Sequence, residues 1–378
     1  MNPYEESQTH IVEANRLLRA EDVQSARFHF RKAADLQWSF VKALPGDRVR
    51  TIAVYGLSAA TLYYRAHALD EAEGIIHRLL SRESIEEHSQ WGLRDLLARI
   101  WNEQQMEAMG YHLPAQPVSV TFSRGNILHG LAATDAVDTP IRSVLNLFQR
   151  IAAWMGGFPF SAKPHSLLNE SYRAFSSEPA LGSYRIDLYL AQDAQLVLDL
   201  PDVGQLPSPD SVMSSFIQVV SCASEGDYGG LCSLVGDEPY RTVFIRLLRN
   251  AVPDGTEVGE VEFRRADEPK EQAVSLYPSH REPLRHMLRQ SQPPSARVAP
   301  EQVQQYTGVL RAVDLDANLL RLDMDGGKMP FHKAHDILDD IVGPLLNKRV
   351  TITGHYPRRT GGRFRASDIE LAVDSEAA

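Results

Sequence analysis

The stretch YTGVLRAVDLDANLLRLDMDGGKMPF, residues 306–331, decides how the C-terminal part of the chain folds. Apolar and polar residues alternate in three short runs, and Asp325-Gly326-Gly327 joins the last two. Alternation with a period of two predicts half-buried strands, and Asp-Gly is a hairpin-turn signal. A helical segment, AHDILDDIVGPLL, and a second hairpin, from KRVTITGHY to FRASDIELA, follow. Five short strands with one helical insertion predict a small barrel of the OB or SH3-like kind.

The predicted barrel segregates its charges, although it is not basic overall. Residues 304–378 contain 10 Lys and Arg against 11 Asp and Glu, in a chain of formal net charge −10. From Gly343 to Ala366 there are six basic residues and no acid, whereas Asp314 to Asp340 contains seven acids and three bases. The sequence GHYPRRTGGRFRASD places four arginines around one turn: Arg358, Arg359, Arg363 and Arg365.

Two interpretations of this arginine hairpin remain open. Tyr356 and Phe364 could stack on bases beside the arginines, and sites for single strands combine cations with aromatic rings. The alternative is a solvated turn or a cationic patch for a protein partner, because domains that bind nucleic acid usually carry a larger charge excess.

The segment before the barrel predicts a linker and a mixed α+β domain. RQSQPPSARVAPEQ, residues 289–302, is rich in proline and serine and has no periodicity, which is typical of a linker. Upstream, helices alternate with strands, and the predicted strands are VSVTF (118–122), SYRIDLYL (183–190), QLVLDL (195–200) and EVEF (260–263). In TPIRSVLNLFQRIAAWMGG, Thr139 is expected to cap a helix that starts at Pro140.

Residues 1–110 carry almost no strand signal and a clear helical periodicity. Ala14 and Ala26, and again Ala60 and Ala72, are 12 positions apart, so two helices of a hairpin can approach closely. This spacing resembles the tetratricopeptide helical hairpin, although the copies are 46 residues apart rather than about 34, and Leu79 stands where a small residue is usual. The resemblance implies a groove for a peptide or partner helix. The candidate residues for that groove are Tyr55, Tyr63 and Tyr64.

The expected organisation is therefore multidomain α+β. It comprises a helical domain (1–110), a mixed α+β domain (111–290), a linker (291–303), a small OB/SH3-like β-barrel (304–372) and a tail (373–378). The central and C-terminal patterns together resemble uncharacterised bacterial proteins in which a mixed domain precedes a GVLRAVDLD…LNKRV barrel. That resemblance implies a fold and no named activity.

Familiar chemical motifs are absent from the sequence. It contains neither GxxxxGK[ST] nor GxGxxG, and DLDANL (314–319) lacks the glycine of a calcium loop. Cys222 and Cys232 fit no zinc knuckle and are expected to be buried thiols. A proline interrupts the EPK segment (268–270) that would complete a nuclease-like metal site. We therefore expect no catalytic residue, cofactor or metal.

Three functions remain open. The first is a cytoplasmic interaction or scaffold protein that binds a protein or peptide through its helical hairpins, with the barrel as a second contact surface. The second is a nucleic-acid-binding factor that uses the arginine hairpin. The third is a hydrolase or nuclease with an unrecognised central site, although the sequence leans away from an enzyme. Neither a signal peptide nor a membrane segment is expected, and a homo-oligomer is possible.

Overall fold

The computed structural model divides into two compact units, Met1–Ala115 and Gln116–Ala378. Each unit is described by itself. The described residues are 3–20, 22–82, 85–114, 116–128, 130–161, 166–177, 184–193, 206–266, 270–291, 303–314, 317–324, 327–333, 339–356 and 364–372. No helix within these ranges is both long enough and apolar enough to cross a bilayer.

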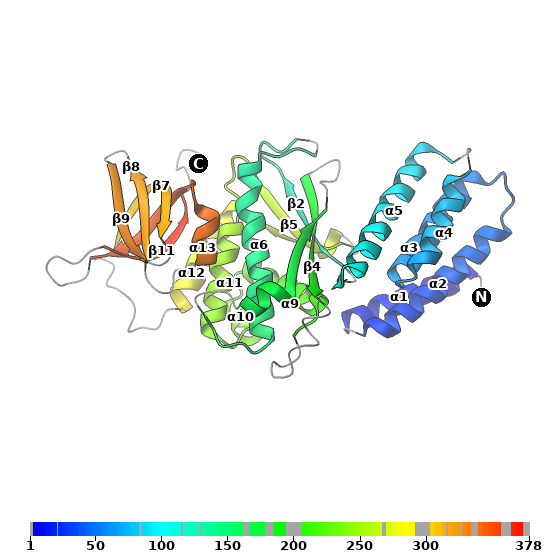
Figure 1. Ribbon diagram of the computed structural model, residues 1–378, viewed down its shortest axis with the longest axis horizontal. Helices are drawn as coiled ribbons and strands as arrows, with labels where there is room; N and C mark the ends of the chain where they lie inside the picture. The colour runs from blue at the N-terminus through cyan, green and yellow to red at the C-terminus, as the bar shows by residue number, and fades with distance from the viewer. Residues whose placement is uncertain are drawn as a thin grey trace. The chain divides into compact units, whose positions relative to one another are not determined.

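The first unit is built from helices. They are α1 (Pro3–Arg19), α2 (Val23–Ala43), α3 (Val49–Arg65), α4 (Leu69–Leu80) and α5 (Glu87–Ala108) (Figure 1). A two-residue strand, β1 (Tyr111–His112), follows them. The four alanines that the sequence pairs at 12-residue spacing, Ala14, Ala26, Ala60 and Ala72, are completely buried. The predicted close approach of paired helices is therefore present.

Leu79, which stands where the tetratricopeptide pattern usually has a small residue, packs against Gly56 on α3. A Cβ atom added to Gly56 on α3 would lie 2.7 Å from Cδ1 of Leu79 on α4, closer than carbon atoms can approach. The bulky leucine thus occupies the space that the glycine leaves open. A large residue on α4 therefore faces a glycine on α3, which lets the two helices pack closely.

The second unit begins with an antiparallel sheet. Its strands run in the order β3-β4-β2-β5-β6, and every neighbouring pair is antiparallel. The bounds are β2 (Val118–Ser123), β3 (Tyr172–Ser176), β4 (Tyr184–Asp193), β5 (Glu260–Arg265) and β6 (Val274–Leu276). The predicted strands at 118–122, 183–190 and 260–263 are confirmed, and QLVLDL lies outside the described residues.

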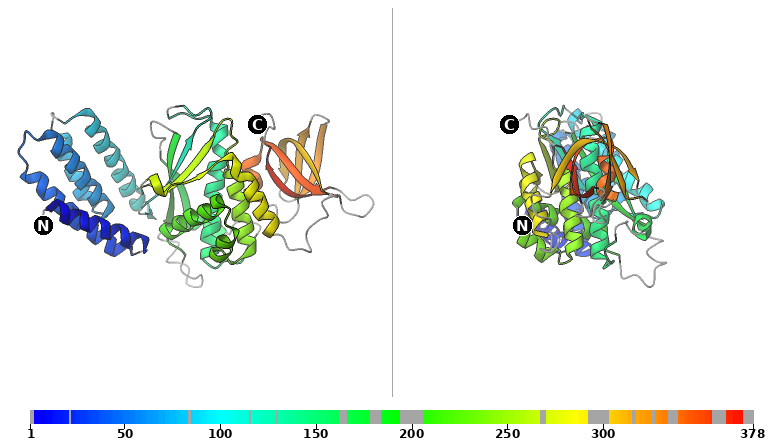
Figure 2. Two further views of the ribbon diagram at one scale, coloured as in Figure 1. Left: turned by 180° about the vertical axis from the view of Figure 1, so that it is seen from behind. Right: turned by 90° about the vertical axis from the view of Figure 1, so that its left-hand side faces the viewer.

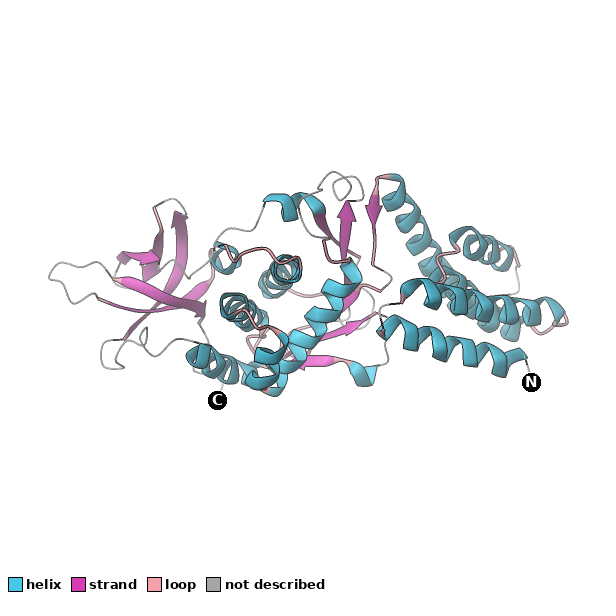
Figure 3. Cartoon of the chain, turned by 90° about the horizontal axis from the view of Figure 1, so that it is seen from below, coloured by secondary structure: helices cyan, strands magenta, loops and turns pink. Residues whose placement is uncertain are grey.

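Helices form the next layer. Figure 1 labels α6 and α11 between the sheet and the C-terminal barrel, and Figure 3 shows helices between the two groups of strands. The helices of this unit that precede the barrel are α6 (Thr134–Met155), α7 (Ser166–Ser171), α9 (Pro209–Glu225), α10 (Tyr228–Leu234), α11 (Glu238–Ala251) and α12 (Arg281–Ser291). Two 3-10 turns, Lys270–Gln272 and Pro278–His280, flank β6. Phe216 joins the layers, since its ring contacts Phe148 on α6 and Phe263 on β5.

Two local predictions in this layer are wrong. Helix α6 begins at Thr134 rather than at Pro140, so Thr139 lies inside the helix and does not cap it. Its hydroxyl instead donates to the carbonyl of Pro344, 3.0 Å away. Pro140 lies inside the helix, where its missing N–H costs one intrahelical hydrogen bond. Cys222 and Cys232 are free thiols but only half-buried.

The C-terminal strands form a closed barrel. They are β7 (Gln304–Asp314), β8 (Leu319–Met324), β9 (Gly327–Lys333), β10 (Arg349–His355) and β11 (Arg365–Leu371). The order around the barrel is β7-β8-β9-β11-β10, and β10 closes it against β7. Strands β9 and β11 are parallel, and α13 (Asp339–Val342) with a 3-10 turn (Gly343–Leu345) connects β9 to β10. Figure 2 (right) shows the unit from the barrel end.

The barrel is not a freely tethered module. It shares one hydrophobic core with the helical layer, and Ile341, Val342 and Leu345 are buried in it. Arg150 on α6 donates to Asp340 at 2.6 Å, and Asn250 on α11 donates to the carbonyl of Ile341 at 3.2 Å. The outer surface of the barrel is therefore divided into a covered side and an exposed side.

Candidate functional site

The covered side of the barrel is held by buried ion pairs from β11. Arg249 on α11 is 1% exposed and donates to both carboxylate oxygens of Asp368, at 2.6 and 2.7 Å. Arg285 on α12 makes two similar bonds to Glu370, at 3.0 and 2.9 Å. Such forked pairs fix geometry as well as charge. We call this contact, formed by the pairs Arg249–Asp368 and Arg285–Glu370, the joint between the barrel and the helical layer.

Charges in the joint are mutually dependent. Burial opposes ionisation of Asp368, but the charge and hydrogen bonds of Arg249 outweigh it and hold the pKa of Asp368 below its usual value. Burial lowers the pKa of Arg281 to about 10 against the attraction of Glu370. Arg281 donates to the carbonyl of Val252, 2.9 Å away. The arginines are thus compensated by acids and carbonyl groups of the same unit.

The exposed side of the barrel carries cations on three neighbouring strands. Arg321 on β8 is opposite Pro330 on β9, and Lys328 on β9 is opposite Asp323. Arg365 at the start of β11 lies beside His332. The side chains of Arg321, Lys328 and Arg365 are exposed, and none forms an ion pair with another described residue. They constitute what we call the cationic face.

Among the described residues of β7 and β8, the acids next to the cationic face are Asp323 and Asp314. Asp323 faces Arg311, with 3.7 Å between the carboxylate oxygen and Nε. Asp314 accepts a hydrogen bond from the backbone N–H of Ala317, 2.8 Å away, and so caps the turn between β7 and β8. Among the described residues, this side therefore carries more cations than acids, in contrast to the formal charge of −10 of the whole chain.

Aromatic rings close the end of the barrel from which the arginine hairpin extends. Tyr306, Phe331 and Phe364 contact one another with ring centroids 5.1 to 5.3 Å apart, and Tyr356 stands edge-on to Phe364 at 5.3 Å. Phe364 is only 2% exposed, so the expectation that it stacks on a base is wrong: its ring fills the barrel core. Tyr356 is 43% exposed and keeps an accessible ring. A hydrogen bond to Tyr356 raises the pKa of Tyr306.

Only part of the predicted arginine hairpin can be placed. Arg365 is exposed on β11, whereas Arg358, Arg359 and Arg363 lie outside the described residues. Both ends of that segment are fixed, because Gly354 pairs with Ala366 and His355 with Arg365 across the hairpin. Sequence reasoning missed Arg321 and Lys328, although their alternation with buried Leu320, Leu322 and Phe331 predicts that they point outward.

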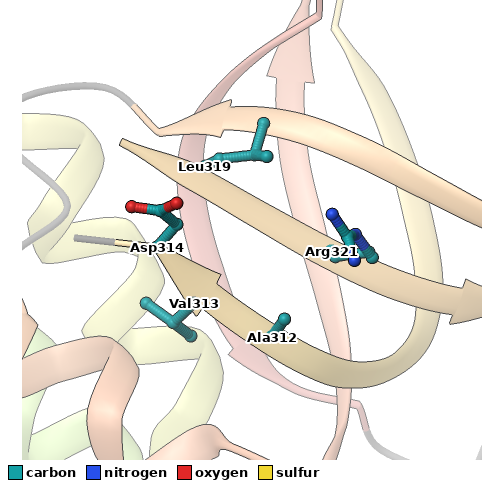
Figure 4. Close-up of a pocket in the computed structure, with 5 residues that line it drawn as sticks. All are labelled: Ala312, Val313, Asp314, Leu319 and Arg321. Atoms are coloured by element: carbon teal, nitrogen blue, oxygen red, sulfur yellow. The ribbon is translucent and has the colours of Figure 1, made fainter. Parts of the chain in front are cut away.

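A shallow pocket of about 400 Å³ lies at the edge of the cationic face. It is lined by Ala312, Val313, Asp314, Leu319 and Arg321, from β7 and β8. Figure 4 shows the carboxylate of Asp314 and the guanidinium of Arg321 on opposite sides of this hollow, with Leu319 and Ala312 between them. The pocket thus has a carboxylate at one corner, a guanidinium at the opposite corner and the apolar side chains of Leu319 and Ala312 at the corners between them.

The predicted docking tyrosines of the helical unit are less available than expected. Tyr63 is buried and donates to Asp35 at 2.6 Å, so it is a structural residue rather than a surface contact. Tyr55 and Tyr64 are half-buried, and the ring of Tyr55 packs against Phe40. The largest exposed rings of this unit include Trp91 and Trp101 on α5, which are 60% and 47% exposed.

One polar cluster in the helical unit has the composition of a metal site. His67, in the turn between α3 and α4, lies 3.1 Å through Nδ1 from Glu103 and 2.8 Å through Nε2 from Glu107. Because the two carboxylates contact opposite ring nitrogens, they match an imidazolium that donates twice rather than a metal ligand. The hydrogen bond to Glu103 accordingly raises the pKa of His67.

A second polar cluster surrounds Glu260 at the edge of the sheet. Its carboxylate accepts from Tyr277 at 2.7 Å, Ser275 at 2.9 Å and Ser123 at 3.2 Å, and pairs with Arg124. Burial opposes ionisation, but these bonds prevail and lower the pKa of Glu260. A carboxylate with its acceptor sites filled is suited to holding strands together rather than to proton transfer.

Comparison of the chain with family models, curated proteins and solved structures finds no match.

Proposed function

We propose that the protein binds single-stranded nucleic acid through the cationic face of its C-terminal barrel. The strand order β7-β8-β9-β11-β10, the parallel pair β9–β11 and the helix between β9 and β10 support an OB-type barrel. Barrels of that type bind oligonucleotides on the face of their second and third strands and with the loops beside it. In this chain those strands are β8 and β9.

The observation that carries the proposal is the set of Arg321, Lys328 and Arg365 on adjacent strands. Each is exposed and has no acidic partner among the described residues, so its charge is available to a phosphate. Cations that already have carboxylate partners would gain little from phosphate binding. The sequence between β10 and β11 contains three further arginines, Arg358, Arg359 and Arg363, which lie outside the described residues.

A single strand is favoured over a duplex because of Tyr356. Its exposed ring stands at the barrel end where β10 stops, and it is held edge-on by Phe364. Unpaired bases stack on such rings, whereas bases in a duplex are already stacked on one another. Positive charge and an ordered aromatic ring together match a flexible strand.

The test is fluorescence anisotropy of labelled single- and double-stranded DNA and RNA across a salt series. We expect the intact protein to prefer single strands and to lose affinity as salt rises. Arg321→Ala/Lys328→Ala/Arg365→Ala should weaken binding at least tenfold. The matched control removes the same charge from exposed positions outside the barrel, Arg142→Ala/Arg173→Ala/Lys270→Ala, and should bind normally. Equal losses in both variants would refute a specific face.

Partner docking by the helical unit is the second candidate. Terminal helices of a repeat stack normally present a polar outer face, but α5 exposes Trp91 and Trp101. The indole N–H of Trp101 donates to Glu73 on α4 at 2.9 Å, which fixes the ring before any partner arrives. An amphipathic helix of a partner protein would cover both rings. Affinity purification from native cells tests this proposal: Trp91→Ser should lose a partner that Phe28→Ser, another exposed ring, retains.

A further inference from the structure

The pocket between β7 and β8 has the chemistry of a base-recognition site. Asp314 is opposite Leu319 in the strand pairing, and Ala312 is opposite Arg321. Asp314 and Arg321 are therefore diagonal neighbours, a relation that separates such residues by roughly 7 to 8 Å. The side chains of Leu319 and Ala312 lie between them (Figure 4). A flat ring lying across these four side chains would meet a carboxylate at one edge and a guanidinium at another.

We propose that this pocket holds a guanine base of the bound strand. The inference rests on the proposed function and specifies its ligand. Guanine offers two adjacent donors, N1–H and the N2 amine, to one carboxylate, and two acceptors, O6 and N7, to one guanidinium. An arginine bonded to O6 and N7 is the commonest specific contact to guanine. Asp314 takes the donor edge and Arg321 takes the acceptor edge.

The other bases satisfy the pocket less well. Uracil has one ring donor, and cytosine and adenine each have one amine, so none can give two different donor groups to Asp314. The pyrimidines are also shorter than the diagonal between the two side chains. Each of those bases would leave hydrogen-bonding sites of Asp314 or Arg321 unfilled, so it should bind more weakly than guanine. Guanine is the one base that fills both ends.

The fold prepares Asp314 for this role. Its Oδ1 accepts from the N–H of Ala317, so the carboxylate is oriented before binding. Oδ2 and the second acceptor site of Oδ1 remain for the two guanine donors. A register shift in β7 between Leu310 and Ala312 precedes the site. Such a bulge bends a strand and turns its side chains relative to the partner strand. Ala312 then leaves room where a larger residue would fill the floor.

The experiment measures base preference in strands that cannot form guanine quadruplexes. Labelled nine-nucleotide oligouridylates carry guanine, inosine, adenine, cytosine or uracil at the centre, and anisotropy gives each affinity. We expect guanine to bind roughly tenfold more tightly than uracil, as one bidentate contact allows. Inosine, which lacks the N2 amine, should lie between them. Equal affinity for all centres would overturn the guanine site while leaving strand binding intact.

Conservative variants separate recognition from charge. Arg321→Lys keeps the charge but loses the forked donor geometry, so it should abolish the guanine preference with little change for oligouridylate. Asp314→Asn can keep the cap on Ala317 through its amide oxygen and should also lose the preference. Arg365→Lys, on the same face but outside the pocket, should retain it. Retention of the preference in Arg321→Lys and Asp314→Asn would overturn the assignment.

Guanosine monophosphate provides an independent arm. Equilibrium dialysis with this free nucleotide reports on the pocket even if no strand binds. Binding of the nucleotide that is lost in Asp314→Asn, without any strand binding, would support the guanine site and refute the proposed strand-binding function. Absence of both nucleotide and strand binding would overturn both proposals.

Discussion

The two sides of the C-terminal barrel use the same residue type for opposite purposes. On the covered side, Arg249 and Arg285 each donate two hydrogen bonds to a carboxylate of β11. On the exposed side, Arg321 and Arg365 face solvent without such a partner among the described residues. An arginine that is already paired holds parts of the chain together. One without an acid remains available to an anionic ligand.

The comparison also explains why total charge misleads. The predicted barrel region has one more acid than bases, 11 against 10, which argues against nucleic-acid binding if counted as a whole. Arginines of the helical layer, however, already form ion pairs with three of these acids, Asp340, Asp368 and Glu370. Removing these acids from the count leaves a surface more positive than the composition indicates.

Breaking the joint should have the largest effect. Asp368→Asn leaves Arg249 buried without its full counter-charge. Because Asp368 is partly exposed and Glu370 remains 3.6 Å from Arg249, the cost should lie below the about 3–5 kcal/mol of a fully buried pair. Urea denaturation of the intact protein measures this loss. Arg249→Met/Asp368→Leu removes both charges and should recover most of it. Similar midpoints for Asp368→Asn and the wild type would mean that the joint contributes little.

Acid should weaken the same joint. The pKa of Asp368 is lower in the folded protein than its ordinary value, despite burial, because Arg249 stabilises the carboxylate. Its contribution is therefore complete above the unfolded pKa of about 3.9 and is lost as pH falls through the folded value. Urea midpoints from pH 6 to pH 3 should fall more steeply for the wild type than for Asp368→Asn. Parallel curves would show that Asp368 does not carry the effect.

A weaker pairing of the same kind should respond to alkali in the helical unit. The hydrogen bond to Glu103 raises the pKa of His67, whereas burial and the charge of Arg27 oppose this shift. The protonated His67 therefore stabilises the folded state fully below its unfolded pKa of about 6.5. This contribution is lost as pH rises through the folded pKa. His67→Asn tolerates the positive φ of 58° and should cost about 0.5–1 kcal/mol at pH 6 and less at pH 8.5. Hydrogen exchange of α5 is the measurement, and a pH-independent difference would contradict it.

Removing exposed cations should have the smallest effect on stability. Arg321→Ala/Lys328→Ala/Arg365→Ala breaks no ion pair with a described residue, so each change should alter the unfolding free energy by less than about 0.5 kcal/mol. With oligouridylate, which offers no guanine to Arg321, the same variant should reduce the slope of log affinity against log salt by roughly 2, about 0.7 for each phosphate that is no longer neutralised. A large stability loss with an unchanged salt slope would mean that these residues stabilise the fold rather than bind phosphate.

Local patterns in the sequence predicted most of the elements. Alternation located β2, β4 and β5 and the barrel strands, and the 12-residue spacing of Ala14 and Ala26 located a tight helical hairpin. These signals are periodicities within one element, which neighbouring residues determine. Thr139 was misassigned because its partner, Pro344, is 205 residues away in the sequence.

The candidate site was predicted only in part for the same reason. Arg365 and Tyr356 were identified by composition, whereas burial of Phe364 depends on its contacts with Tyr306 and Phe331 from other strands. The cationic face requires knowledge that β9 pairs with both β8 and β11. A parallel contact between strands so far apart in the chain leaves no local mark in the sequence.

Gly354 has a consequence for how the arginine hairpin can evolve. A Cβ atom there would lie 2.1 Å from the carbonyl oxygen of Arg365 and 2.6 Å from the ring of Phe364. Selection should therefore keep glycine at this position in descendants that retain the hairpin. Substitutions elsewhere in the hairpin can then change the preferred ligand while its base stays the same. One invariant position would then give the neighbouring sequence freedom to diversify.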